Sequence, residues 1–335
     1  MNGKPVPVNP VIKLSEIIEP VKADLKGFDH EFDAALHSDV TLINTIGKFL
    51  IKTKGKHVRP VITLLASHLC GKPTENTYRA AAMIELLHLA TLIHDDVVDE
   101  AKHRRSWPSA NRIWKNKISV LMGDYILSKS LIYMIRLKNF DALEAIAATA
   151  ESLSAGEILQ IEKSLKRKIT EEVYFKMISQ KTASLMATSA ELGAITTTGR
   201  ETDRKKMYTY GINLGIAFQV KDDLFDLLGA EASTGKDMGA DVKRNMRTLP
   251  LIYALDQADT SRRNQIHRLL KSAKKSTQAL SELRNVIETA GGIAHAEKRL
   301  HEYSQKAIRA LNDYPPSPYK QSMIRLLEFN AQRNK

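Results

Sequence analysis

The chain has 335 residues, of which 43% are hydrophobic, so it can bury one large core or two smaller ones. Its single cysteine, Cys70, excludes an internal disulfide framework and a cysteine-rich zinc site, and fits a reducing cytoplasm. The formal charge of +12 favours a basic surface with anionic ligands, whereas 6% aromatic residues and the absence of zinc-finger spacing or an arginine-rich tail argue against nucleic acid.

Helical signals recur along the chain, and no alternating strand pattern with hairpin turns occurs. Residues 1–10 hold no apolar stretch of signal-peptide length, so we expect a mobile tail there. No apolar run approaches the roughly 20 residues that span a bilayer. Residues 11–335 predict a single all-α domain, soluble and cytoplasmic. The expected helices span 38–54, 60–69, 74–101, 119–137, 141–165, 170–196, 201–228, 248–258, 261–273, 276–290, 293–311 and 319–332.

Two aspartate clusters share one pattern. Asp95-Asp96-Val97-Val98-Asp99 falls inside the expected helix 74–101, and Asp222-Asp223-Leu224-Phe225-Asp226 ends the helix 201–228. Residues four apart lie on one helical face, where like charges repel, so these carboxylates need positive charge nearby. Carboxylate oxygens suit magnesium, which keeps water and phosphate oxygens in its coordination shell. The repeated pattern predicts several magnesium ions around one diphosphate.

Basic residues flank both clusters. Arg104 and Arg105 follow the first cluster, Lys56 and Arg59 lie in a Gly-Lys-His-Val-Arg segment, and Lys236 follows the second cluster. Arginine matches phosphate oxygens with two parallel hydrogen bonds, and lysine supplies a point charge. Together with the acids they predict a site for two diphosphates, one bridged by metal and one held by lysine and arginine.

Several short blocks follow one another along the chain: Leu86-Leu87-His88 with Ile93 to Glu100, Gly123-Asp124-Tyr125, Gly156 to Gln160, Lys181-Thr182-Ala183 and Phe218 to Asp226. Blocks in this order are typical of the trans-isoprenyl diphosphate synthases of the polyprenyl synthetase family, and the chain resembles the long-chain members. The resemblance runs from about Gly55 to Asp256. The family implies a homodimer of mostly antiparallel helices around a central cavity, the isoprenoid synthase fold.

The resemblance also implies roles for individual residues. The family ionises an allylic diphosphate, and the double bond of isopentenyl diphosphate attacks the resulting cation; the departing diphosphate takes the proton. The implied magnesium ligands are Asp95, Asp96, Asp99, Asp222, Asp223 and Asp226. The implied allylic diphosphate ligands are Arg104, Lys181 and Lys236, and those of isopentenyl diphosphate are Lys56, Arg59, His88 and Arg105. Thr182 and Gln219 are expected to face the developing cation.

Three stretches depart from the family pattern. Lys54-Gly55 stands where relatives usually have two glycines, and Ser106-Trp107 replaces a glycine and a small polar residue. Before Thr248-Leu249-Pro250, where a second lysine or an asparagine is common, the chain reads Asn245-Met246-Arg247; Asn245, Arg247 or Lys243 is expected to serve instead. These departures bear on substrate affinity more than on reaction type.

Product length in the family depends on the helix before the first cluster. Thr91 and Ala90 are small here, and Leu87 lies one turn deeper. From Thr91 to Ala80 the helix spans about 16 Å, which is room for several isoprene units and predicts a product of roughly six to ten units in all. The other interpretation is that the small residues only pack closely against a neighbouring helix. A long product suggests a quinone side-chain precursor, and its release is compatible with transient membrane contact.

Three alternatives remain at this stage. A short-chain synthase making farnesyl or geranylgeranyl diphosphate would share both clusters. A class I terpene cyclase shares the first cluster, but its second metal motif differs from a repeated DDxxD. A non-catalytic partner subunit of a heteromeric synthase normally loses aspartates, and none is lost here.

Overall fold

The computed structural model describes residues 12–53, 57–101, 103–104, 107–166, 169–228, 242 and 246–333. The tail predicted for residues 1–10 lies outside these ranges. The N-terminal half contains α1 (Leu14–Ile18), η1 (Glu19–Val21), α2 (Leu25–Leu36), α3 (Thr41–Thr53), α4 (Val58–Cys70), α5 (Glu75–Val98), β1 (His103–Arg104), β2 (Trp107–Pro108), α6 (Ala110–Arg136) and α7 (Phe140–Lys166). The C-terminal half contains α8 (Glu171–Ile178), η2 (Ser179–Ala183), α9 (Ser184–Ile195), α10 (Glu201–Leu228), α13 (Leu249–Asp256), α14 (Thr260–Ser272), α15 (Thr277–Thr289), α16 (Gly292–Ala310) and α17 (Pro318–Gln332).

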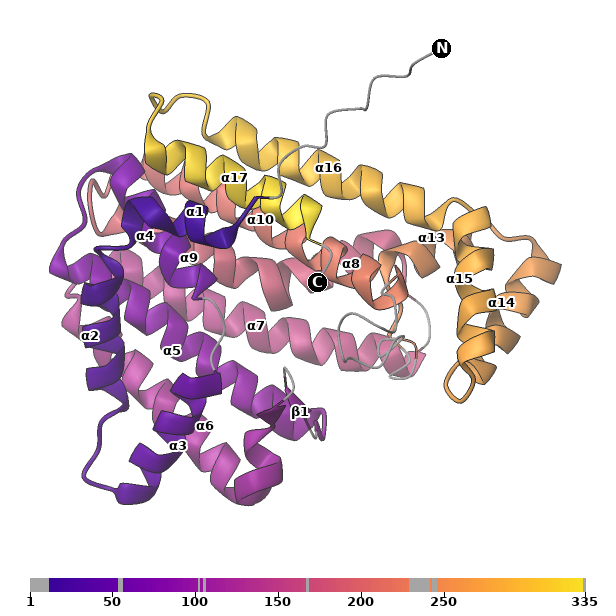
Figure 1. Ribbon diagram of the computed structural model, residues 1–335, viewed down its shortest axis with the longest axis horizontal. Coiled ribbons are helices and arrows are strands. Elements are labelled where there is room, and N and C mark those ends of the chain that lie inside the picture. The colour runs from indigo at the N-terminus through magenta and orange to yellow at the C-terminus, as the bar shows by residue number, and fades with distance from the viewer. Residues whose placement is uncertain are drawn as a thin grey trace, which may run out of the picture.

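The prediction of an all-α fold is confirmed, with one addition. Strands β1 and β2 form a two-residue antiparallel hairpin directly after α5. The other described elements are helices, packed as shown in Figure 1, with α14 and α15 forming a lobe at one end of the molecule. Helices α1 and α2 are additions too, since no helix was predicted before residue 38.

Helix α9 lies at the centre of the bundle. It packs against α4, α5, α7 and α10, and nearly all of its residues are buried. A polar helix could not be placed there, because each buried polar group without a partner costs free energy. The few polar side chains of α9 find partners: Thr188 Oγ1 lies 2.5 Å from Thr149 Oγ1 of α7.

Two glycines set the distance from α10 to η2 and to the start of α9. A Cβ atom on Gly215 would lie 2.5 Å from Ala183 Cα, and one on Gly211 would lie 2.5 Å from the Met186 carbonyl oxygen. No side chain fits at these distances, so glycine lets the two backbones approach closely. This close approach brings Thr182 of η2 next to Gln219, one turn after Gly215.

The helix predicted over 170–196 is not one continuous α-helix. A single helix was expected over 170–196, but the segment is divided into α8, a π-helical turn (η2) and α9. The acids in the first turn of α8 and the Thr170 cap do start a helix there, as the sequence indicates. The π turn arises where Lys181 and Thr182 lie, and such turns are frequent at functional sites.

Helix α6 is the one described helix that is long and apolar enough to cross a membrane by length and composition. Within its most apolar stretch of 18 residues, 39% is buried inside the protein, largely against α5. The helix begins at Ala110, nine residues before the predicted start, and Lys115 has a positive φ of 67° within it. Its exposed side therefore carries apolar residues, including Leu121, Leu131 and Ile135.

Candidate active site

The first aspartate cluster ends α5. Thr74 caps the start of this helix in a capping box with Thr77. At the other end Asp95 and Asp96 lie in the last turn and Asp99 is the C-cap, so the helix is shorter than the predicted 74–101. Asp96 is buried, Asp95 half-buried and Asp99 exposed.

The second cluster occupies the same position on α10. Asp222, Asp223 and Asp226 fall within its last two turns, before the helix ends at Leu228. Neither α5 nor α10 has a basic residue in its last turn. Carboxylates at the negative end of a helix are electrostatically unfavourable. Both helix ends therefore carry negative charge that a bound cation would offset.

Asp223 is buried and held by two hydrogen bonds. It is 5% exposed, and it accepts hydrogen bonds from the Tyr174 hydroxyl (2.6 Å) and from Gln219 Nε2 (2.9 Å). The Gln219 Oε1 atom in turn accepts from Thr182 Oγ1 at 3.0 Å. This chain of hydrogen bonds fixes the orientation of the Gln219 amide, because its NH₂ group must face the carboxylate and its oxygen the hydroxyl.

Lys181 connects its own block to the block from Gly156 to Gln160 on α7. Its Nζ atom lies 2.5 Å from Glu157 Oε2 and 3.2 Å from Gln160 Oε1, both on α7. Gly156 makes this contact possible, since a Cβ atom there would lie 2.7 Å from the Lys181 backbone nitrogen. The ammonium group is thus oriented by α7 while the π turn presents it at the cavity described next.

A cavity of about 170 Å³ brings these groups together. Its polar lining residues include Lys181, Thr182, Gln219 and Asp223, and its apolar ones include Ile169, Met177 and Ile178. Arg247 also lines it, and Arg247 is one of the residues expected to serve where the family has a second lysine or an asparagine. The remaining lining residues are Gln160, Ser164, Tyr174, Met246 and Thr248.

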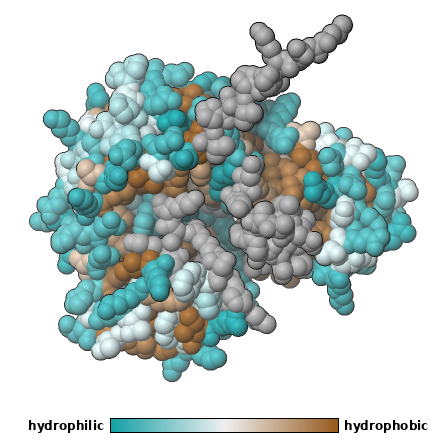
Figure 2. Space-filling model, viewed as in Figure 1, coloured by the Kyte–Doolittle hydropathy of each residue, from teal (hydrophilic) through white to brown (hydrophobic). Residues whose placement is uncertain are grey.

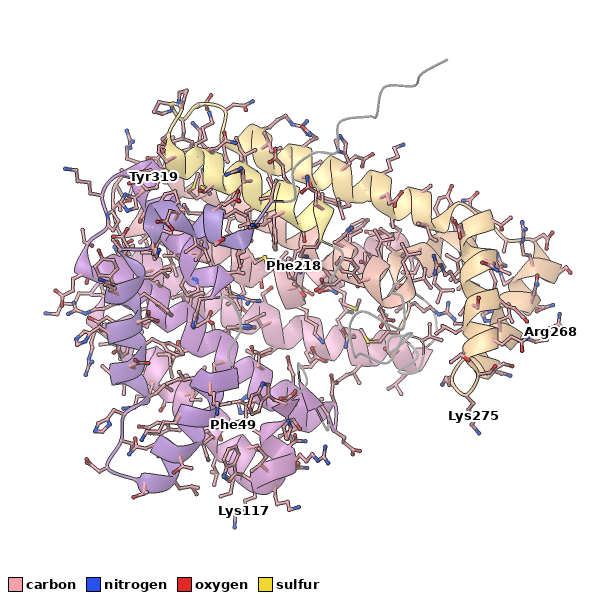
Figure 3. All side chains as sticks on the ribbon, viewed as in Figure 1. Phe49, Lys117, Phe218, Arg268, Lys275 and Tyr319 are labelled. Carbon is pink, nitrogen blue, oxygen red and sulfur yellow. The ribbon has the colours of Figure 1, made fainter. Side chains whose placement is uncertain are left out.

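Asp222 interacts with the far end of the chain. The Arg333 guanidinium, just after α17, forms an ion pair with the Asp222 carboxylate and lies 4.2 Å from the Phe218 ring centroid. Burial and the Arg333 charge lower the pKa of the Lys221 ammonium next to Asp222. Figure 3 labels Phe218 at this junction of α10 and α17. Sequence patterns gave no signal for Arg333, because the contact depends on how α17 packs against α10.

The residues expected to bind isopentenyl diphosphate are only partly described. Arg59 and His88 are half-buried on α4 and α5. His57, which has a positive φ of 47°, places Nδ1 3.1 Å from the Glu85 carboxylate of α5. Lys56, Arg105 and Lys236 lie outside the described residues, as do Lys243 and Asn245, and of Arg104 the backbone alone is described, in β1.

The expected chain-length residues lie on the buried side of α5. Ala90 and Leu87 belong to the hydrophobic core around α2, α5 and α6, whereas Thr91 is half-buried and donates its hydroxyl to the His88 carbonyl (2.8 Å). Helix α6 covers this side of α5, and its Ser130 hydroxyl donates to the Met83 carbonyl at 3.2 Å. Any tunnel below the first cluster would therefore be bounded by α6.

The carboxylates fit a hard divalent cation by their chemistry. Within the described ranges no three His, Cys, Asp or Glu side chains converge closely enough to hold a metal ion alone. Magnesium does not need such a group, because it binds through one or two carboxylates and takes its other ligands from water and phosphate. Zinc or calcium held by protein atoms alone would need more ligands than these residues provide.

The chain is similar to known proteins over nearly its whole length. A sequence model described as polyprenyl synthetase matches residues 40–287. An octaprenyl diphosphate synthase of Escherichia coli is 32% identical, covering 97% of this chain and 100% of that protein. An all-trans-nonaprenyl-diphosphate synthase (geranyl-diphosphate specific) of Rhodobacter capsulatus is 31% identical, covering 95% and 97%.

Solved structures agree with the sequence comparisons. A decaprenyl diphosphate synthase of Rhodobacter capsulatus superposes with a TM-score of 0.90 at 31% identity, covering 96% of this chain and 99% of that one. A polyprenyl synthase of Caulobacter crescentus, complexed with calcium and isoprenyl diphosphate, has a TM-score of 0.90 at 29% identity, covering 98% and 100%. The helical bundle described above is therefore shared with enzymes of prenyl transfer.

Proposed function

Because the chain belongs to the polyprenyl synthetase family, we propose that it is a prenyltransferase that joins isopentenyl diphosphate head to tail to an allylic diphosphate. Geranyl, farnesyl or geranylgeranyl diphosphate is the proposed primer. The observation that carries this proposal is the cavity where Lys181, Thr182 and Gln219 meet the second aspartate cluster. The Lys181 ammonium group can bind a diphosphate there. The Thr182 hydroxyl and the Gln219 carbonyl oxygen can stabilise a carbocation.

The proposed roles combine the family resemblance with the contacts of the described residues. Lys181, held by Glu157 and Gln160, binds the allylic diphosphate together with Arg104 and Lys236. Gln219, fixed by Asp223 and Thr182, directs its carbonyl oxygen and the Thr182 hydroxyl toward the positive charge that develops on the allylic carbon. Lys56, Arg59, His88 and Arg105 hold isopentenyl diphosphate with its double bond at attack distance.

We propose that the divalent cation is magnesium. Asp95, Asp96, Asp99, Asp222 and Asp226 would hold it, with Asp223 orienting Gln219 beside them. When bound, the ions neutralise charge on the departing diphosphate. The relative from Caulobacter was solved with calcium and isoprenyl diphosphate, which supports a cation of this class in the site.

We propose a long product, roughly six to ten isoprene units, because Thr91 and Ala90 before the first cluster are small and the helix from Thr91 to Ala80 spans about 16 Å. The similar proteins named octaprenyl and nonaprenyl synthases support this length. Such a product would serve as a precursor of a quinone side chain. Structures of geranylgeranyl pyrophosphate synthases also resemble the chain, for example that of Pyrococcus horikoshii with a TM-score of 0.89, so a shorter product is the outcome to test against.

Product analysis tests the proposal. Purified protein is incubated with farnesyl diphosphate, isotopically labelled isopentenyl diphosphate and magnesium, and the products are resolved by mass spectrometry. We expect a long all-trans series that disappears when the metal is chelated. Products that stop at geranylgeranyl length would support the proposed reaction but contradict the proposed product length. Consumption of the allylic substrate alone indicates a cyclase, and no elongation with any primer indicates a partner subunit.

We also propose that residues 11–335 form one domain and that the enzyme is a cytoplasmic homodimer. Helices α6 and α7 expose large apolar side chains, and an exposed patch of this kind is typical of an association surface. The most exposed are Phe140 (87%), Leu165 (79%), Ile135 (71%), Ile158 (67%) and Leu121 (56%).

Charge placed on this surface is expected to separate the subunits. Leu121→Lys with Ile135→Lys should halve the mass measured by light scattering at micromolar concentration, because each lysine would be desolvated at the interface. The matched control is Leu42→Lys, an exposed leucine of α3, which should leave the mass unchanged. A double variant that keeps the wild-type mass would place the subunit contact elsewhere.

A further inference from the structure

The α14–α15 lobe holds a large share of the net charge of the protein. Between residues 260 and 281 there are six lysine and arginine residues and no aspartate or glutamate; with Glu282, Arg284 and Glu288 of α15 the whole lobe, residues 260–289, has a formal charge of +5 against +12 for the whole chain. These residues lie on α14 and in the turn to α15, at the end of the molecule in Figure 1. They are Arg262, Arg263, Arg268, Lys271, Lys274 and Lys275.

The charge lies on the outer surface of the lobe. All six basic residues but Lys274 are exposed, and Figure 2 shows mainly hydrophilic residues over this lobe. Arg268 and Lys275 point away from the body of the protein in Figure 3. Among the described residues neither of these two, nor Lys271, forms an ion pair with an acid. Their charge is therefore available to an external anionic partner.

A second cavity lies beside α14, between this helix and the residues around Met246 and Leu251. Its volume is about 480 Å³, and Lys271 and Lys274 of the lobe line it together with His267. Val242, Leu251 and Leu270 contribute apolar side chains to its wall. Met246 and Arg247 line this cavity and also the smaller cavity of the candidate active site. The lobe is thus adjacent to the place where the prenyl chain would be made.

We propose that the α14–α15 lobe binds the phosphate groups of anionic lipids and docks the enzyme on a membrane surface, with the second cavity accepting a lipid headgroup. Arg268 and Lys275 diverge outward, which suits a charged surface and not one small anion. The cavity pairs ammonium groups with apolar walls, as the junction of a headgroup and its hydrocarbon requires. Residues 260–281 contain no Phe, Tyr or Trp on which bases could stack, which argues against single-stranded nucleic acid.

The reason for such docking rests on the proposed function, since a long polyprenyl product is insoluble in water and must reach a membrane. The docking itself does not depend on catalysis. The vesicle assay therefore tests membrane docking, and an activity assay in solution separately tests the proposed prenyltransferase function.

The test is sedimentation of the full-length protein with vesicles of phosphatidylcholine, with or without about one-third phosphatidylglycerol. The wild type should sediment with vesicles that contain phosphatidylglycerol but not with vesicles of phosphatidylcholine only. High salt should release it from the anionic vesicles. Each basic residue near such a surface contributes roughly a fivefold factor, so a lobe variant lacking four charges should bind at least about a hundredfold more weakly. Its substitutions are Arg262→Gln, Arg268→Gln, Lys271→Gln and Lys275→Gln.

A control variant removes the same number of charges from exposed positions elsewhere. It should bind the vesicles like the wild type, and both variants should elongate a soluble primer at the wild-type rate, which also shows that they fold. The control carries Lys26→Gln, Lys48→Gln, Lys298→Gln and Arg309→Gln.

Three results would overturn the proposal. Equal vesicle binding by the lobe and control variants would show that overall charge is responsible. Binding of inorganic diphosphate that is lost in Lys271→Gln with Lys274→Gln, without vesicle binding, would assign the cavity to a soluble anion. Binding of duplex DNA without vesicle binding would assign the lobe to nucleic acid.

Discussion

Replacing Asp95 by asparagine is expected to reduce turnover by about 10²–10³-fold, which is the usual effect of removing one preorganised charge from a catalytic site. Asparagine keeps the shape of the side chain but lacks the charge that would hold magnesium. The same change should alter the free energy of unfolding by no more than about 1 kcal/mol, because Asp95 lies at the negative end of α5, where a carboxylate contributes little to stability. Steady-state kinetics and urea denaturation measure the two effects.

Asp256 provides the matched control, because it is the last residue of α13, an aspartate at the same kind of helix end, and is exposed. Asp256→Asn should have a similar effect on stability and leave turnover unchanged. If Asp95→Asn turned over at the wild-type rate, the first cluster would not hold the cation. Loss of activity accompanied by unfolding would instead assign Asp95 a structural role.

The helices were well predicted where local signals determine them. Helix α10 spans the predicted 201–228 because acids in its first turn start it and its apolar residues keep one period to the second cluster. The omission of α2 was avoidable: its buried Phe28, Phe32 and Leu36 recur every fourth residue. The π turn η2 was not accessible in this way, since it depends on Lys181 meeting α7 and on Ala183 meeting Gly215.

The candidate site divides along the same line. Its carboxylates were predicted because both clusters repeat one short pattern, which is visible in a single sequence. Tyr174 and Arg333 were not found, although the one holds Asp223 and the other pairs with Asp222. Neither has neighbours in the sequence that suggest such a role. Contacts such as Tyr174 with Asp223 and Arg333 with Asp222 depend on how helices distant in the sequence pack together, so they can be identified only from the structure.

Introducing an aromatic side chain at Thr91 is expected to shorten the product. Thr91 is half-buried one turn before the first cluster, and the helix below it extends about 16 Å to Ala80. In Thr91→Phe the ring would occupy the path of the growing chain, so mass spectrometry should show products several units shorter than those of the wild type. Consumption of the first isopentenyl diphosphate should continue, because the diphosphate sites are untouched.

The control for Thr91→Phe is Thr91→Val, which removes the hydrogen bond to the His88 carbonyl but keeps the volume. It should give the wild-type product length, so that length follows the size of the side chain and not the lost hydrogen bond. An unchanged product distribution in Thr91→Phe would mean that Thr91 packs against a neighbouring helix and that the growing chain follows another path. A shortened product in Thr91→Val as well would place the determinant in the position of His88.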